Sequence, residues 1–147
     1  MSTESPIKDV DARMRHTMLP VKDIEKSKDF YHRLLGMNIM RERVNQKKEA
    51  VAYVGYGNED THPCLELIEM ASDAPTRTIN PWDGHIALAV TRLYDICGYL
   101  EKEGVTFKQA AGPVGPGRKD LVAFLYDPDG YEVELTERAS GSLAVSS

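Results

Sequence analysis

The sequence predicts an α+β fold built from two copies of a βαβββ module, in which one strand and one helix precede three further strands. One observation is a histidine-led apolar segment that occurs twice, as HTMLPV from His16 and as HIALAV from His85, 69 positions apart. Another is a pair of acidic strands, LELIE at 65–69 and VELTE at 133–137, which repeat at a spacing of 68. Two related halves explain both repeats.

Each half carries the same order of elements. In the first module, residues 13–71, the apolar pattern predicts a helix at 24–35 and strands at 14–21, 37–44, 50–56 and 63–70. In the second module, residues 84–138, it predicts a helix at 92–103 and strands at 84–90, 106–110, 120–126 and 131–137. Residues 72–83, with two prolines, are expected to be a linker. Residues 1–12 are expected to be a disordered N-terminus and residues 139–147 a flexible tail.

Polar residues and glycines mark the ends of both helices. Asp23 and Thr91 are expected to be the N-caps, because short polar side chains accept hydrogen bonds from the first-turn amides. Gly36 and Gly104 are expected to end the helices in a left-handed conformation. Apolar faces follow at three-four spacing: Ile24, Ser27, Tyr31, Leu34 and Leu35 in the first helix, and Leu93, Ile96, Cys97 and Leu100 in the second.

Alternation along the strands places the histidines away from the core. In HIALAV, Ile86, Leu88 and Val90 form the bulky face, which leaves His85 with two alanines on the other face. HTMLPV repeats the pattern less cleanly, with His16 opposite the bulky residues. We expect the smaller faces to open into a cavity with histidine at its rim.

A glutamate in the last strand of each half shares the face of that histidine. Glu134 alternates with two core residues, whereas Glu66 shares its face with Cys64, Ile68 and Met70. A carboxylate among apolar side chains needs a partner, because leaving it unpaired costs several kcal/mol. A divalent ion is one such partner, and imidazole with carboxylate suits Ni, Co, Zn, Mn or Fe(II). The repeat therefore indicates a ligand set of His16, Glu66, His85 and Glu134.

Each of these residues also has a simpler interpretation when taken alone. His85 could be a polar residue at a strand edge, Glu134 a solvated side chain, and Glu66 the partner of a lysine or arginine. Recurrence of both residue types in both halves favours the ligand set. His32 and His62 have no counterpart and are expected at the surface, and DPDG at 127–130 is expected to be a turn.

Composition excludes several classes of protein. The net charge of −5 argues against a nucleic-acid or anionic membrane surface, which needs clustered Lys and Arg. No apolar run approaches the roughly 20 residues that span a bilayer, and residues 1–13 lack a signal-peptide hydrophobic region. The two cysteines, Cys64 and Cys97, lie in apolar stretches and are expected to be buried free thiols in a reducing cytoplasm.

Five segments occur in a specific order between residues 14 and 138: HTMLPVKDIEKSKDFYHRLLGM, YVGYG, GHIALAV, AGPV and VAFLYDPDGYEVELTE. They resemble the glyoxalase I (lactoylglutathione lyase) family of the vicinal oxygen chelate superfamily. The resemblance implies two paired βαβββ modules that form a cup-shaped mixed sheet, the glyoxalase/bleomycin-resistance fold. It also implies that His16, Glu66, His85 and Glu134 bind one divalent metal per site. Short chains of this layout are similar to bacterial members that prefer Ni or Co, with Zn possible.

The activity that the resemblance implies is isomerisation of a 2-oxoaldehyde–thiol hemithioacetal. Methylglyoxal plus glutathione, or another thiol as co-substrate, would yield an S-2-hydroxyacyl thioester such as S-lactoylglutathione, which detoxifies methylglyoxal. The proton moves through a metal-bound enediolate with a carboxylate as base. Glu134 is the principal catalytic candidate and Glu66 its counterpart. If the two modules face apart, each site takes His16 and Glu66 from one chain and His85 and Glu134 from another, which predicts a C2 homodimer.

Two positions depart from the family pattern. Pro20 stands where an arginine typically grips a glutathione carboxylate, and Met70 stands where an asparagine helps to hold glutathione. Either another basic residue takes over, or the substrate is not the usual glutathione adduct. Candidates for that contact are Arg43, Arg77, Arg118 and Lys119, of which Arg118 and Lys119 are the predicted substrate-binding residues.

Other members of the superfamily remain as alternatives. An epimerase of a CoA thioester uses similar base and enolate chemistry, and LELIEMASDAPT resembles a run that epimerases carry. DPDGYEVELTE and glutamate at the second ligand position favour the glyoxalase instead. An extradiol dioxygenase needs two histidines and one carboxylate on iron. A non-catalytic small-molecule binding protein of the bleomycin-resistance type lacks a full ligand set, so the intact set of four counts against it.

Overall fold

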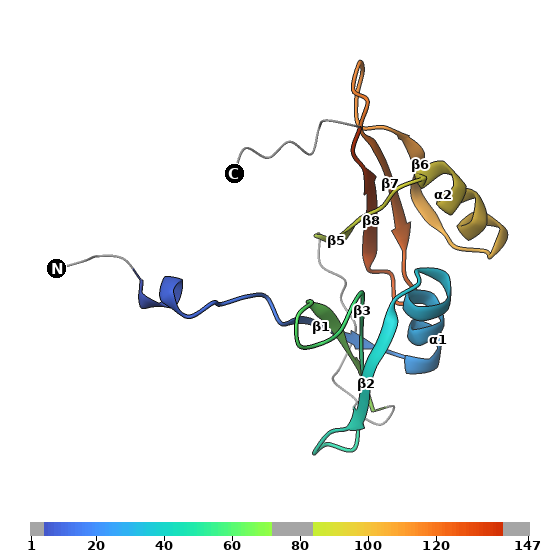
Figure 1. Ribbon diagram of the computed structural model, residues 1–147. Coiled ribbons are helices and arrows are strands. Elements are labelled where there is room, and N and C mark those ends of the chain that lie inside the picture. Colours follow the sequence, from blue (N-terminus) through green and yellow to red (C-terminus); the bar gives the residue numbers. More distant parts are fainter. Residues whose placement is uncertain (1–4, 72–83, 140–147) are drawn as a thin grey trace. The chain divides into compact units, whose positions relative to one another are not determined.

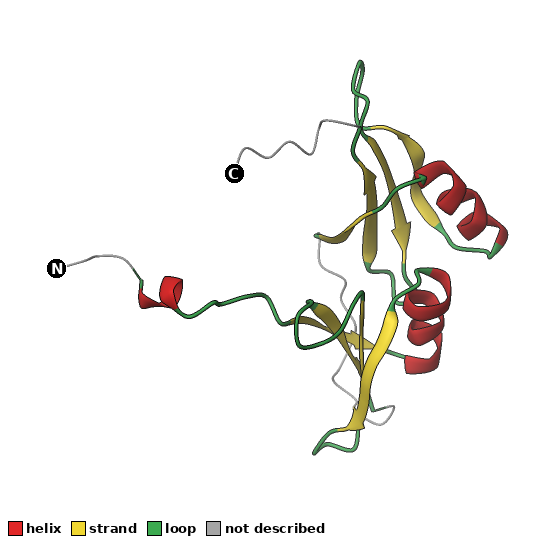
Figure 2. Ribbon diagram, in the orientation of Figure 1, coloured by secondary structure: helices red, strands yellow, loops and turns green. Residues whose placement is uncertain are grey.

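The computed structural model describes residues 5–71 and 84–139. The chain divides into two compact units, Met1–Arg77 and Thr78–Ser147. Each unit contains one four-stranded mixed sheet with a helix packed against it (Figures 1 and 2). The predicted α+β fold with two βαβββ modules is therefore confirmed. The predicted linker at 72–83, residues 1–4 and residues 140–147 of the predicted tail lie outside the described residues.

The first unit contains the first βαβββ module. Its sheet has the order β1–β4–β3–β2, with β1 parallel to β4 and the other pairs antiparallel. The elements are η1 (Pro6–Asp9), β1 (His16–Val21), α1 (Ile24–Lys28), η2 (Asp29–Leu34), β2 (Asn38–Val44), β3 (Ala50–Gly55) and β4 (Cys64–Glu69). The predicted helix is present, but its second half, η2, is π-helical. The short 3-10 turn η1 buries no residue.

The second unit repeats this arrangement. Its sheet has the order β5–β8–β7–β6, with β5 parallel to β8 and the other pairs antiparallel. The elements are β5 (His85–Ala89), α2 (Leu93–Lys102), β6 (Phe107–Pro113), β7 (Leu121–Tyr126) and β8 (Glu132–Glu137). β6 continues three residues beyond the predicted strand, through two register irregularities. The DPDG turn is confirmed, since the Gly130 amide donates to the Asp127 carbonyl at 3.0 Å.

Apolar side chains on the predicted faces form the core of each unit. The helical faces are confirmed by burial of Ile24 and Tyr31 in the first unit, and of Leu93, Cys97 and Leu100 in the second. The strand alternation is confirmed as well, with Leu19 and Val21 of β1 and Val133 and Leu135 of β8 essentially inaccessible. Neither helix in the described ranges has the length and apolar character needed to cross a bilayer.

The ends of the helices follow the sequence with one exception. Asp23 caps α1 by accepting from the Glu25 and Lys26 amides at 3.0 and 3.2 Å. Gly36 and Gly104 follow the helices with φ of 73° and 83°, as expected. The prediction of Thr91 as the second N-cap is wrong, because Arg92 holds that position with a left-handed φ of 60° and makes no capping bond.

A glutamate from the last strand satisfies the first helical amide in both units. The Glu69 carboxylate accepts from the Ile24 amide at 2.8 Å, and the Glu137 carboxylate accepts from the Leu93 amide at 2.6 Å. A negative charge at a helix N-terminus also interacts favourably with the helix dipole. α2 therefore obtains from β8 the capping group that was expected from Thr91.

Candidate metal centre

In the first unit, parallel pairing of β1 with β4 brings His16 and Glu66 together. The register places Met18 beside Glu66, so His16 lies two residues earlier on the same face. His16 Nε2 and Glu66 Oε1 are 3.7 Å apart. Glu66 is only 8 % exposed, as its expected position among apolar residues implies.

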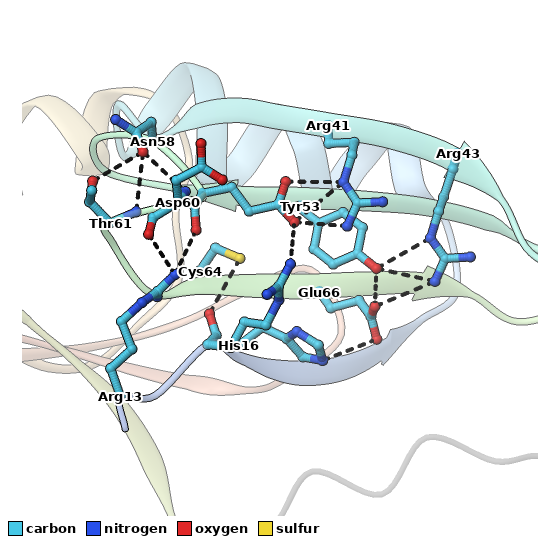
Figure 3. Close-up of polar contacts among 12 residues, drawn as sticks. Arg13, His16, Arg41, Arg43, Tyr53, Asn58, Asp60, Thr61, Cys64 and Glu66 are labelled. Atoms are coloured by element: carbon cyan, nitrogen blue, oxygen red, sulfur yellow. Dashed lines mark hydrogen bonds and ion pairs between the residues drawn. The ribbon is translucent and has the colours of Figure 1, made fainter. Parts of the chain in front are cut away.

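Two side chains that the sequence did not assign to Glu66 hold its second oxygen (Figure 3). Tyr53 of β3 lies directly across the sheet and donates a short hydrogen bond to Glu66 Oε2. Arg43 of β2 donates to the Tyr53 hydroxyl oxygen at 3.1 and 3.3 Å, and its Nη2 lies 3.7 Å from Glu66 Oε2. The simpler interpretation of Glu66, pairing with an arginine, is therefore observed alongside its pairing with His16.

The Tyr53 ring is enclosed by charged and aromatic neighbours. The Arg41 guanidinium lies 4.1 Å from the ring centroid, and the edge-on His16 ring lies 5.9 Å away. Arg41 also forms a bidentate pair with Glu59, at 2.7 and 3.0 Å. Its hydrogen bond lowers the pKa of Glu59, and the same bond raises the pKa of Arg41. These contacts fix the tyrosine beside the carboxylate.

In the second unit, β5 and β8 form the equivalent pair. Ala87 lies beside Glu134 in the register, and His85 Nε2 approaches Glu134 Oε2 to 2.6 Å. The position directly across the sheet from Glu134 is occupied by Phe124, whose ring meets the His85 ring edge-on at 5.4 Å. Phe124 thus replaces Tyr53 and carries no hydroxyl group.

A pocket of about 240 Å³ opens beside Glu134. Its lining combines acidic and basic side chains from the β6–β7 loop and β8: Val114, Arg118, Asp120, Leu121, Glu134, Thr136, Glu137 and Arg138. Arg118, one predicted substrate-binding residue, therefore shares a cavity with the predicted base. Lys119, the other, is exposed and does not line this pocket. Arg77 falls outside the described residues.

The donor atoms in both pairs fit a divalent cation. Each pair presents one imidazole nitrogen and one carboxylate oxygen, the donors that borderline and hard divalent ions prefer. Cys64 is a buried free thiol, as predicted, and burial raises its pKa. Within the described ranges, no three His, Cys, Asp or Glu side chains converge, so each unit supplies a pair.

The sequence did not predict Tyr53 as a partner of Glu66, and it indicated Arg43 only as a candidate contact to the substrate. The YVGYG strand contained a usable signal, because Tyr53 is a polar aromatic in an otherwise apolar and buried strand. His32 and His62 are exposed, as expected, and lie outside both pairs.

The chain is similar in sequence and in structure to known proteins. The family model of the Glyoxalase/Bleomycin resistance protein/Dioxygenase superfamily matches residues 13–135. A lactoylglutathione lyase of Neisseria meningitidis is 36 % identical over 135 residues, which are 91 % of this chain and 96 % of that protein. A lactoylglutathione lyase of Escherichia coli O157:H7 is 38 % identical over 126 residues, 85 % of this chain and 92 % of that protein.

Solved structures agree with these matches. The trypanothione-dependent glyoxalase I of Leishmania major aligns with a TM-score of 0.72 and 30 % identity, covering 86 % of this chain and 87 % of that one. Glyoxalase I of Zea mays aligns with a TM-score of 0.75 and 30 % identity, and this chain spans only 45 % of its length. The chain is thus lactoylglutathione lyase-like, and it belongs to the Glyoxalase/Bleomycin resistance protein/Dioxygenase superfamily.

Proposed function

We propose that this protein is a metal-dependent glyoxalase I, which converts the hemithioacetal of methylglyoxal and glutathione to S-lactoylglutathione. The observation that carries the proposal is the pair of His–Glu contacts, His16 with Glu66 and His85 with Glu134, at equivalent positions of two modules. The 36–38 % identity to lactoylglutathione lyases supports it independently.

These four residues would hold one divalent ion, with Ni or Co favoured and Zn possible. When bound, the ion supplies Lewis-acid stabilisation of the negative charge that develops on two neighbouring substrate oxygens. All four side chains present nitrogen or oxygen donors, which suit this group of cations.

The proposed chemistry of the protein is a proton transfer between adjacent carbons. A carboxylate oxygen of Glu134 accepts the proton from the carbon that bears the sulfur and delivers it to the neighbouring carbon. The hydroxyl proton moves likewise from the first substrate oxygen to the second, so that the product is an isomer of the adduct. Glu134 lines an open pocket, which supports its role as principal base, with Glu66 as its counterpart.

Recognition of the thiol part is proposed to rest on Arg118, because this residue lines the pocket that contains Glu134. Pro20 and Met70 leave two of the family's usual glutathione contacts absent. An arginine matches a carboxylate in a bidentate geometry. Lys119 is a weaker candidate, since it does not line the pocket.

The proposed assembly is a C2 homodimer in which each site takes His16 and Glu66 from one chain and His85 and Glu134 from the other. Since each pair supplies only two donors, a four-ligand site needs both pairs. This chain spans only 45 % of the length of the maize glyoxalase I chain, so two copies of it together approach the length of that enzyme. Light scattering tests whether the protein is a dimer. Mixing inactive His16→Ala chains with inactive His85→Ala chains tests the shared site, because each mixed dimer contains one site with all four residues intact and should recover activity. A monomer with full activity would overturn it.

A cytoplasmic location is also part of the proposal, supported by two buried free thiols, Cys64 and Cys97. Fractionation of cells that produce the protein tests it. Recovery from a secreted or membrane fraction would contradict it.

The activity is tested with purified protein that is stripped of metal and reloaded with Ni, Co or Zn. In one assay methylglyoxal is mixed with glutathione or with another thiol. In a separate assay a chiral CoA thioester is supplied alone. Thioester formation from the glutathione mixture, dependent on metal, is the expected result. Racemisation of the CoA thioester alone would favour an epimerase. Tight binding without turnover would favour a binding protein, a role carried on this fold by an antibiotic-binding protein of Streptomyces (TM-score 0.66, 23 % identity).

A further inference from the structure

The two glutamates of the proposed site have equivalent positions but different neighbours. Tyr53 pairs across the sheet with Glu66, and Phe124 pairs across the sheet with Glu134. Both rings meet the neighbouring histidine edge-on, with interplanar angles of 68° and 86°. The residue across the sheet from each glutamate therefore differs between the two units by a single hydroxyl group.

We propose that Tyr53 is a positioning residue whose hydroxyl fixes Glu66 as the stationary carboxylate of the site and leaves Glu134 as the carboxylate that moves. This inference rests on the proposed function. It assigns different duties to two residues that the repeat alone makes equivalent.

The contacts of the hydroxyl support this division. Tyr53 donates to Glu66 Oε2 and accepts from Arg43, while Glu66 Oε1 faces His16. Tyr53 is only 3 % exposed, so rotation of Glu66 would leave a buried hydroxyl without its acceptor. Breaking a buried hydrogen bond to a charged group is costly, because the separated groups have neither each other nor water as a partner. Glu66 is thus restricted to one orientation, with one oxygen available for a cation.

Glu134 pairs with His85 at 2.6 Å but has no contact equivalent to those of Tyr53 and Arg43 among the described residues. The residue across the sheet is Phe124, which cannot donate a hydrogen bond. The Glu134 side chain is 19 % exposed, compared with 10 % for Glu66, and it borders a pocket of about 240 Å³. A carboxylate that must approach two substrate carbons in succession needs such freedom.

Reciprocal variants, Tyr53→Phe and Phe124→Tyr, test the proposal in the full-length protein. Tyr53→Phe is expected to raise the Kd of Ni or Zn, measured against a chelating dye, by about 10- to 100-fold, as for loss of an outer-shell hydrogen bond. Its kcat at saturating metal should fall by a smaller factor. Phe124→Tyr is expected to retain the metal and to lower kcat by about tenfold or more, because the added hydroxyl restrains Glu134. Tyr126→Phe, a tyrosine on the same strand as Phe124, serves as the matched control and should change neither quantity.

Three results separate the possible failures. Wild-type metal affinity in a folded Tyr53→Phe protein would overturn the positioning role, and the dye measurement needs no substrate. Wild-type kcat in Phe124→Tyr, with its metal bound, would overturn the mobility of Glu134. If wild-type protein binds metal but turns over no hemithioacetal, the proposed function fails, and the effect of Tyr53→Phe on metal affinity still decides the positioning role. Circular dichroism and urea unfolding of the metal-free variants establish that each one folds.

Discussion

The two units share a scaffold but differ in what surrounds the His–Glu pair. In both, parallel first and last strands place a histidine and a glutamate on one face. In the first unit a tyrosine and an arginine hold the glutamate, and in the second a phenylalanine leaves it beside an open pocket. The strand register thus fixes where the carboxylates lie, whereas the residue across the sheet decides whether each one accepts a cross-strand hydrogen bond.

The largest expected effect is loss of metal from either histidine variant. If both pairs serve one ion, His16→Ala and His85→Ala should each weaken metal binding by more than ~100-fold, since loss of an outer-shell partner alone costs 10- to 100-fold. Metal content after gel filtration, measured by mass spectrometry, checks this. His62→Ala is the control, because His62 is exposed and outside both pairs. Full retention of metal by His85→Ala would remove that residue from the ligand set.

The next largest expected effect is a difference in kcat between variants of the two glutamates. Under metal-saturating conditions, Glu134→Gln is expected to lower kcat by about 10²- to 10⁴-fold, because glutamine cannot accept the proton. Glu66→Gln should lower kcat less, since the stationary carboxylate need not take up a proton. The measurement is steady-state kinetics with metal occupancy determined in the same sample. Near-normal turnover by Glu134→Gln would make Glu66 the leading candidate for the base.

The helix caps predict a smaller difference, in stability. Glu137→Ala should lower the free energy of unfolding by about 1–2 kcal/mol, because Arg92 provides no side-chain cap for α2. Glu69→Ala should cost about half as much, because α1 retains Asp23. Urea unfolding gives both values, and hydrogen exchange of the Leu93 and Ile24 amides locates the change. Glu101→Ala on the exposed side of α2 should lie within about 0.5 kcal/mol of wild type. Equal losses in the two cap variants would contradict the comparison.

The smallest expected effect concerns the Arg41–Glu59 pair of the first unit. Arg41 lowers the pKa of Glu59 in the folded state. The contribution of Glu59 to stability is therefore present above its ordinary pKa of 4.5 and is lost as the pH falls through the lower folded value. The stability difference between wild type and Glu59→Gln should shrink between pH 7 and pH 3, as measured by urea midpoints. High salt should shrink it as well, because exposed pairs are screened. A difference that is independent of pH would show that the pair does not contribute.

Most of the fold could be predicted from the sequence, because periodicity and repetition are local or nearly so. The strand and helix faces follow from alternation at two residues and at three to four. The π-helical turn from Asp29 could not be predicted, because it changes the hydrogen-bond pattern and leaves the apolar spacing readable as α-helix. Thr91 has a residue type that favours the N-cap position, but the Leu93 amide is bound by Glu137 instead. Glu137 lies 44 residues along the chain from Leu93, so no local pattern predicts this contact.

The sequence predicted the two His–Glu contacts of the candidate site but not the residues around them. His16, Glu66, His85 and Glu134 stand out because they repeat. Tyr53 does not repeat, and its contact with Glu66 depends on the register between β3 and β4, which one sequence does not reveal. Non-repeating residues are therefore where the two halves acquire different roles.

The acidic strand of each unit serves two partners on opposite faces. In β4, Glu66 faces His16, and Glu69, three residues later, caps α1. Because side chains alternate along a strand, a slip of one residue would turn both carboxylates to the wrong side. A misaligned strand would therefore lose the helix cap and the His–Glu pair together, and the same holds for Glu134 and Glu137 in β8. The register that caps each helix is thus also the register that pairs the histidine with the glutamate.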